Sequence, residues 1–220
     1  RDVAPSRGLG DVYKRQINDL VIDEKAKTVY LSDPEMSLDV GSVGKGYAVE
    51  MVCRAAEARG LTSALVSVGG NLRAIGTKPD GSQWTGGVEN PWNASEVYTS
   101  TNSIFGSPIN MSDLALVTSG DYQRYFVVDG KRYHHIIDPR TGYPAESDLL
   151  SVSVISEDGM LADCMSTALF IEGKQAALQR MQEEAYQLVI VDTDGNIYYS
   201  PSLEGNIQLN TDNQRDYHWN

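Results

Sequence analysis

Residues 124–137 read RYFVVDGKRYHHII, two runs of aromatic and β-branched residues separated by the dipeptide Asp129-Gly130. An Asp-Gly pair between two such runs is typical of a tight β-hairpin. The same pattern recurs at Asp194-Gly195, which separates residues 187–191 from residues 196–199. We therefore expect two hairpins, and with them antiparallel sheet.

The rest of the chain mixes short strands with a few helices. Apolar runs predict further strands at residues 29–31, 64–68, 114–117 and 150–155. Helices are expected at residues 44–58, with Tyr47, Met51 and Ala55 on one stripe, at residues 160–171, and, as a polar surface helix, at residues 174–184. Residues 77–112 are polar and indicate loops around one or two strands. Because strands and helices do not alternate regularly, the pattern favours an α+β fold over a doubly wound sheet.

Length and charge narrow the possible functions. A chain of 220 residues fits one domain with a sizeable core. Residues 1–16 have no clear periodicity, so we expect a non-core tail there and a single domain over residues 17–220. The net charge of -12 argues against a nucleic-acid partner, because no basic surplus exists to neutralise phosphates. No apolar run of about 18 residues predicts a membrane span.

A glycine-rich segment, DVGSVGKG at residues 39–46, leads into the first expected helix. Such a turn exposes backbone N–H groups at the positive end of the helix, which suits a phosphate or pyrophosphate. Lys45 would add a positive charge. The spacing is neither that of a Walker A loop nor G-x-G-x-x-G. A plain strand-to-helix turn is the alternative, just as Gly69-Gly70 reads best as a hairpin turn.

Two of the three histidines are adjacent, at the end of the first hairpin. In a strand, His134 and His135 must point to opposite faces, so at most one can easily serve a given site. A histidine paired with Asp138 would suit general-base chemistry on a hydroxyl. Alternatively, Asp138 caps the turn through Pro139 and the histidines are structural. The residues by themselves leave both interpretations open.

Asp163 and Thr167 stand four positions apart in the second expected helix, so their oxygens lie on one face. A carboxylate and a hydroxyl are hard oxygen ligands, suited to Mg²⁺ with phosphate and water completing the shell. The alternative is a capping or solvated aspartate and a threonine that bonds back to its own helix.

In this order the motifs resemble one family. The runs HHIIDPRTGYP (residues 134–144) and ADCMSTALF (residues 162–170) are the most specific parts of a similarity to the ApbE family, the FAD:protein FMN transferases. The resemblance implies an α+β fold and Mg²⁺-dependent cleavage of the FAD pyrophosphate. FMN would pass to a threonine or serine hydroxyl of an acceptor flavoprotein, and AMP would leave. Alternatives are an FAD pyrophosphatase, as in some relatives, and a non-catalytic flavin-binding protein.

The resemblance also implies roles for single residues. Asp39 and Lys45 would contact FAD, and the backbone around Ile137 would line the flavin nucleotide. His135 matches the base that activates the acceptor hydroxyl.

For the metal, the resemblance implies a Mg²⁺ site formed by the carbonyl oxygen of Ser42 and the side chains of Asp163 and Thr167. It further implies an N-terminally truncated chain and an extracytoplasmic location, with membrane anchoring through an N-terminal leader or lipoprotein signal. The expected partner is a flavoprotein subunit of a membrane redox complex or an exported reductase.

Overall fold

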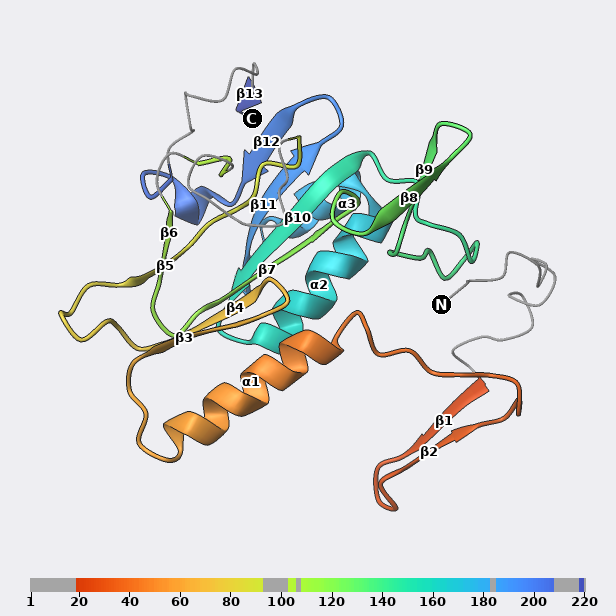
Figure 1. Cartoon of the computed structure of the whole chain (residues 1–220), viewed down its shortest axis with the longest axis horizontal. Helices are drawn as coiled ribbons and strands as arrows, with labels where there is room; N and C mark the ends of the chain where they lie inside the picture. Colours follow the sequence, from red (N-terminus) through yellow and green to blue (C-terminus); the bar gives the residue numbers. More distant parts are fainter. Residues whose placement is uncertain (1–18, 93–102, 106–107, 183–184, 208–217, 220) are drawn as a thin grey trace.

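The centre of the molecule is a seven-stranded sheet with the order β13-β12-β11-β10-β7-β4-β3 (Figure 1). The structure, a computed structural model, describes residues 19–92, 103–105, 108–182, 185–207 and 218–219. Neighbouring strands are antiparallel except for β12 and β13, which are parallel. The strands are β3 (Ala64–Val68), β4 (Asn71–Ile75), β7 (Ala115–Gly120), β10 (Leu149–Ser156), β11 (Gln187–Asp192), β12 (Asn196–Tyr199) and β13 (His218–Trp219).

The two faces of this sheet carry separate hydrophobic cores. Along β11, Leu188 and Ile190 belong to one core, while Val189 and Val191 belong to the other. Successive side chains of a strand point to opposite faces, so a run of apolar residues can fill both cores at once. This is why β11 is a continuous apolar run over residues 188–191.

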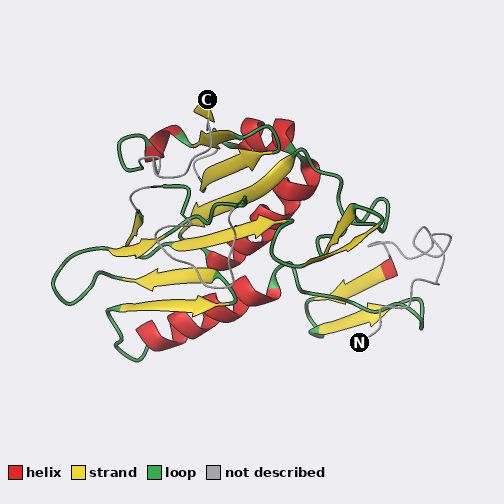
Figure 2. Ribbon diagram, turned by 45° about the horizontal axis from the view of Figure 1, so that its top comes forward, coloured by secondary structure: helices red, strands yellow, loops and turns green. Residues whose placement is uncertain are grey.

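Three helices cover one face of the sheet: α1 (Gly44–Glu57), α2 (Gly159–Glu172) and α3 (Lys174–Arg180) (Figures 1 and 2). Helix α2 begins at Asp158, whose side chain accepts hydrogen bonds from the backbone N–H groups of Met160 and Leu161. It ends at Gly173, where φ is +88°. Both ends therefore follow from local sequence, an N-cap aspartate and a terminal glycine.

The opposite face is covered by the long segment between β4 and β7. Its described parts include β5 (Trp84–Gly86) and β6 (Ile109–Met111), which pair with each other. The side chains of Val88, Ile104 and Phe105 are buried against the sheet. The expected loops around one or two strands are thus confirmed for the described residues.

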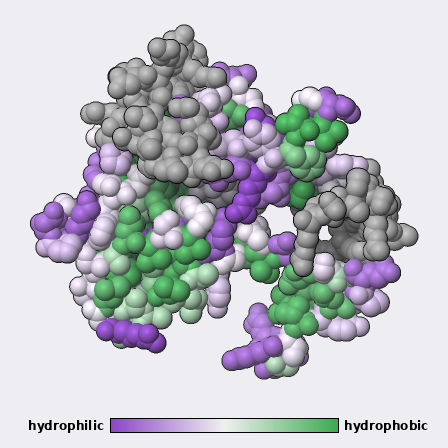
Figure 3. Space-filling model, in the orientation of Figure 1, coloured by the Kyte–Doolittle hydropathy of each residue, from purple (hydrophilic) through white to green (hydrophobic). Residues whose placement is uncertain are grey.

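Two hairpins lie apart from the main sheet. They are β1 (Leu20–Asp23) with β2 (Thr28–Leu31), and β8 (Tyr125–Val128) with β9 (Lys131–His134). Large apolar side chains on both are exposed, and Figure 3 shows apolar surface gathered over each of them, at the right of the view. A short 3-10 helix (Pro201–Leu203) follows β12.

The expected α+β arrangement is confirmed, as are both Asp-Gly hairpins and all three helices. Helix α3 ends at Arg180, before the predicted residue 184, and residues 1–16 lie outside the described ranges. In the described residues no helix is long and apolar enough to cross a membrane.

The predicted stripe of α1 that contains Tyr47 and Met51 is exposed, and the helix buries Val49 and Cys53 against Ile75 of β4. Apolar side chains occur on more than one side of α1, so periodicity could not decide which side meets the sheet.

Candidate functional site

The site is organised where the first turn of α1 meets α2. The backbone N–H of Gly46 donates a hydrogen bond of 2.7 Å to Oδ2 of Asp163, whose side chain is buried. A carboxylate at this place faces the positive end of α1 and satisfies one of its free N–H groups. The predicted metal ligand is therefore fixed against the glycine-rich segment, 117 positions away along the chain.

Ser42 lies just before α1. Gly46 is in the first turn of the helix, where a backbone N–H has no acceptor within the helix, and Asp163 accepts it. Ser42 O accepts no hydrogen bond from any described residue. Oδ1 of Asp163 likewise has no hydrogen-bond partner in the described ranges. Two hard oxygens thus stay available at the start of α1, a donor set that fits Mg²⁺.

The described residues contain no group of three or more His, Cys, Asp or Glu side chains able to hold a metal. A cation here would be bound by one carboxylate and neutral oxygens. Mg²⁺ commonly binds in this way, through one or two carboxylates with substrate phosphates and water filling its octahedral shell. The residues present therefore fit a magnesium ion that arrives with a phosphorylated ligand.

Thr167 lies one turn beyond Asp163 on α2. Its hydroxyl is 3.3 Å from the carbonyl oxygen of Asp163, to which it donates, and 3.1 Å from Oγ of Ser119 on β7. The alternative of a back-bonding threonine is thus observed. Because a hydroxyl oxygen has two lone pairs, this bond does not prevent it from acting as a ligand.

Lys45 supplies the positive charge expected at the same place. Its Nζ donates to Oδ1 of the buried Asn71 at 3.3 Å, which holds the ammonium near the first turn of α1. Asn71 follows the Gly69-Gly70 turn between β3 and β4, and both of these glycines have positive φ. The partner of Lys45 is a neutral amide, so its charge stays available for an anion.

The two histidines occupy different environments, as their alternation predicted. His134 is buried: its Nδ1 accepts the N–H of Ile136, so Nε2 donates to the carbonyl of Ala145 at 3.0 Å. Its ring also meets that of Phe170 edge-on. His134 is therefore a structural residue.

His135 is exposed, and its backbone N–H donates to the carbonyl of Arg124. Partial loss of hydration lowers the pKa of His135 below its ordinary value, and the positive charges of Arg124 and Lys45 lower it further. A neutral imidazole in reach of solvent can accept a proton, which is the property that a general base requires.

No histidine pairs with Asp138 among the described residues. Oδ1 of Asp138 accepts the N–H of Arg140, and its carboxylate pairs with the Arg140 guanidinium at 2.8 Å. These bonds hold the pKa of Asp138 below its usual range. Of the two interpretations left open, the turn-capping one describes Asp138. Ile137, half exposed, pairs with Pro144 across the same turn.

Asp39 is exposed ahead of α1. Its Oδ1 accepts the N–H of Gly41 at 2.6 Å, so the carboxylate shapes the turn. Asp163 thus contacts the glycine-rich segment that contains Ser42 and Lys45, while Asp39 is exposed at the start of that segment. The ligand roles of these residues remain predictions.

Sequence reasoning missed two contributors. Ser119 on β7 contacts Ser166 and Thr167 through its hydroxyl. Glu50 on α1 accepts the N–H of Gly159 at the start of α2. The only signal for Glu50 in the sequence is a shared spacing, a glycine followed four residues later by an acid, in both helices.

Comparisons with known proteins agree with the motifs. The model of the ApbE family matches residues 6–190. The FAD:protein FMN transferase of Klebsiella pneumoniae is 35% identical over 185 residues, which are 83% of this chain and 54% of that protein. The enzyme of the same name from Escherichia coli is 31% identical over 198 residues, 88% of this chain and 54% of its own length. The chain thus spans about half the length of these relatives.

Solved structures show the same likeness. The ApbE protein of Thermotoga maritima superposes with a TM-score of 0.75 at 33% identity, covering 90% of this chain and 63% of that one. The flavin transferase ApbE of Vibrio cholerae gives a TM-score of 0.73 at 29% identity, covering 93% and 63%. Sequence motifs, sheet arrangement and overall match agree, and the chain belongs to the ApbE family.

Proposed function

We propose that this chain is the catalytic part of an FAD:protein FMN transferase, which moves FMN from FAD to a threonine or serine hydroxyl of an acceptor flavoprotein and releases AMP. The observation that supports the proposal is the start of α1, where Asp163 accepts the N–H of Gly46, the residue after Lys45. Ser42 O and Oδ1 of Asp163 accept no hydrogen bond from the described residues. Family membership supports the choice of FAD, since relatives carry that activity in their names.

In the proposed reaction, His135 accepts the proton of the acceptor hydroxyl as its oxygen attacks the phosphorus of the FMN half. The bond between this phosphorus and the bridging oxygen breaks, and the electron pair leaves with AMP. Lys45 and the N–H groups at the start of α1 offset the negative charge of the pyrophosphate. Ser42, Asp163 and Thr167 would hold Mg²⁺, which would neutralise charge as it develops on the leaving phosphate.

Because the protein is acidic, the pyrophosphate of FAD should bind where positive charge is concentrated. The net charge of -12 repels phosphates in general. At the start of α1, this repulsion would be offset by the helix N-terminus, by the Lys45 ammonium and by a divalent cation. We propose an acceptor that is a subunit of a membrane redox complex or an exported reductase, met outside the cytoplasm.

Incubation with FAD and Mg²⁺, with and without an acceptor protein, tests the proposal. AMP release together with covalent FMN on the acceptor, detected by in-gel flavin fluorescence and by mass, is the expected result. AMP and free FMN without acceptor would indicate a pyrophosphatase. FAD that binds but stays intact would contradict any catalytic role.

A further inference from the structure

Two hydrogen bonds join helices α1 and α2 where they cross. In each bond, a carboxylate of one helix accepts a backbone N–H of the other. Gly46 N–H donates to Oδ2 of Asp163 at 2.7 Å, and Gly159 N–H donates to Oε2 of Glu50 at 3.0 Å. In each helix the acid stands four residues after the glycine. Each acid therefore satisfies a free N–H in the first turn of the other helix, at the end where the helix dipole favours negative charge.

The glycines make this crossing possible through their size. A Cβ on Gly46 would lie 2.4 Å from the carbonyl oxygen of Gly159 and 2.5 Å from Cβ of Asp163. A Cβ on Gly159 would come within 3.2 Å of Oε2 of Glu50. Backbone meets backbone here, so a small rotation of either helix would change both hydrogen bonds together.

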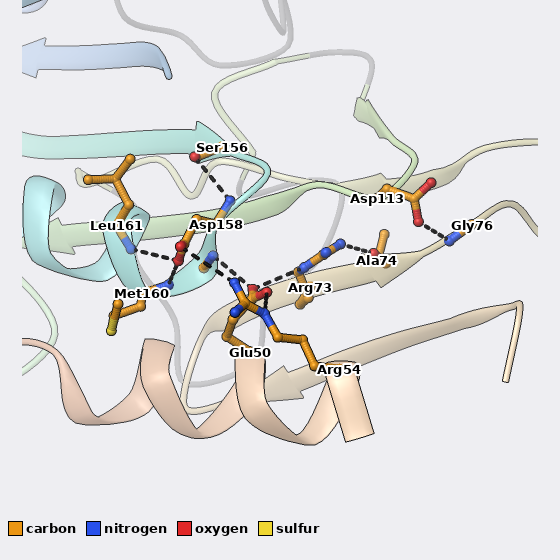
Figure 4. Close-up of polar contacts among 11 residues, drawn as sticks. Glu50, Arg54, Arg73, Ala74, Gly76, Asp113, Ser156, Asp158, Met160 and Leu161 are labelled. Atoms are coloured by element: carbon orange, nitrogen blue, oxygen red, sulfur yellow. Dashed lines mark hydrogen bonds and ion pairs between the residues drawn. The ribbon is translucent and has the colours of Figure 1, made fainter. Parts of the chain in front are cut away.

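Glu50 is itself anchored on two sides, as Figure 4 shows. Oε2 accepts from Nε of Arg73 at 3.2 Å, and Oε1 accepts from Nε of Arg54 at 2.7 Å. Arg73 is buried on β4 and also donates to the carbonyl of Ala74. Burial alone would raise the pKa of Glu50, but the Gly159 amide and the two arginines outweigh it and leave the pKa below its ordinary value. Glu50 is thus an ionised link between α1, α2 and the sheet.

We propose that Glu50 is a positioning residue for Asp163, acting through Gly159 and the helix crossing. This inference rests on the proposed magnesium site. Glu50 touches none of the proposed ligand atoms, but it fixes the first turn of α2, which Asp163 directly follows. Without it, Gly159 N–H and Nε of Arg73 lose this partner, the crossing loosens, and Asp163 is no longer held against the N–H of Gly46. Loss of such outer contacts typically weakens metal binding by roughly 10–100-fold.

The test uses Glu50→Gln and Glu50→Ala with Asp192→Asn as control. Asp192 is equally buried, pairs with Lys174 at 3.1 Å and accepts backbone N–H groups in the β11–β12 turn, so its loss removes a comparable interaction elsewhere. Binding of Mn²⁺ in the presence of FAD is followed by the EPR signal of the free ion, and stability by thermal unfolding. Affinity should fall by roughly 10–100-fold in Glu50→Ala and less in Glu50→Gln, which retains an acceptor oxygen.

A second measurement, by NMR, follows the hydrogen bond of Gly46 at the α1–α2 crossing in the absence of metal. Lys45-Gly46 is the only Lys-Gly pair in the chain, so carbonyl-¹³C lysine with ¹⁵N glycine selects the Gly46 amide alone. Its proton should move upfield in Glu50→Ala as the bond to Asp163 lengthens, and should not move in Asp192→Asn.

The outcomes separate the two proposals. Absence of Mn²⁺ binding by the unsubstituted chain would overturn the metal site and the role of Glu50 with it. Unchanged Mn²⁺ affinity in folded Glu50→Ala, or an unmoved Gly46 signal, would overturn the positioning role alone. A loss of stability shared by Glu50→Ala and Asp192→Asn, with affinity retained in both, would make Glu50 merely structural.

Discussion

The α1–α2 crossing and the β8–β9 hairpin hold the two halves of the candidate site in different ways. At the crossing, Asp163 and Glu50 are buried and each is tied to the opposite helix. The hairpin is a separate two-stranded sheet with exposed apolar side chains, and His135 follows it with one backbone bond to Arg124.

This difference teaches where precision is needed. Metal and pyrophosphate ligands must hold fixed distances, and buried hydrogen bonds between packed helices provide them. A general base has to reach a hydroxyl that another protein brings, and a residue at an exposed strand end can meet it. Regions with few buried contacts also open at lower free energy, so we expect the hairpin to exchange its amides faster than α1 and α2.

The largest effect is expected at the crossing. Asp163→Asn keeps an oxygen for Gly46 N–H but removes the charge that Mg²⁺ would need, so Mg²⁺-dependent AMP release should be abolished with little change in Tm. Asp163→Ala should also cost about 1–3 kcal/mol of stability, because it leaves a buried N–H without a partner. Thr167→Val should be milder, since water can replace a neutral ligand. Normal FMN transfer by Asp163→Asn would remove the metal site from the proposal.

At the hairpin, His135→Ala should lower the rate of FMN transfer by roughly 10²–10⁴-fold, the usual cost of losing a general base, with FAD affinity little changed. His134→Ala is the internal control. It removes a buried ring bonded to Ala145, so it should lower Tm and leave the rate of the folded protein nearly intact. Stopped-flow transfer rates and thermal unfolding measure the two effects. If both variants lose rate alike, the base lies elsewhere.

Lys45 links the two halves, and its removal should affect binding. A charge-assisted hydrogen bond to phosphate contributes about 1.5–3 kcal/mol, so Lys45→Ala should weaken FAD binding by roughly tenfold or more. Riboflavin, which lacks the pyrophosphate, should bind almost unchanged. Fluorescence titration with both ligands decides the matter, because equal losses would mean that Lys45 contacts the ring system or acts through structure.

The smallest effect concerns pH. The pKa of His135 is lowered from 6.5, so its neutral, proton-accepting form persists below pH 6.5 and the acid limb of kcat/KM should fall there. Lys45 is one cause of this lowering, and its charge disfavours the imidazolium. Lys45→Ala should therefore move the acid limb to higher pH. A limb that stays in place would separate His135 electrostatically from the α1 end of the site.

Much of this arrangement was predictable because it depends on local chemistry. Asp-Gly turns between β-branched runs gave both hairpins, and Asp158 with Gly173 gives the bounds of α2. The adjacency of His134 and His135 predicted that their side chains point to opposite faces, since alternation is a property of any strand. By contrast, α1 carries apolar residues on several sides, and its sequence did not reveal that Tyr47 and Met51 stay exposed.

By itself, the sequence determined the elements, their order, the family and the residue types able to bind a phosphate or a hard cation. Only the tertiary structure decided the partners. Asp138 could pair with a histidine or stabilise its own turn, and in the structure it pairs with Arg140 of that turn. The first-turn N–H of Gly46 has no acceptor within its own helix, and its partner in the structure is Asp163, 117 positions away. The physical reason is that side-chain type and local spacing are written along the chain, whereas the competition for each donor depends on which helices the sheet brings together.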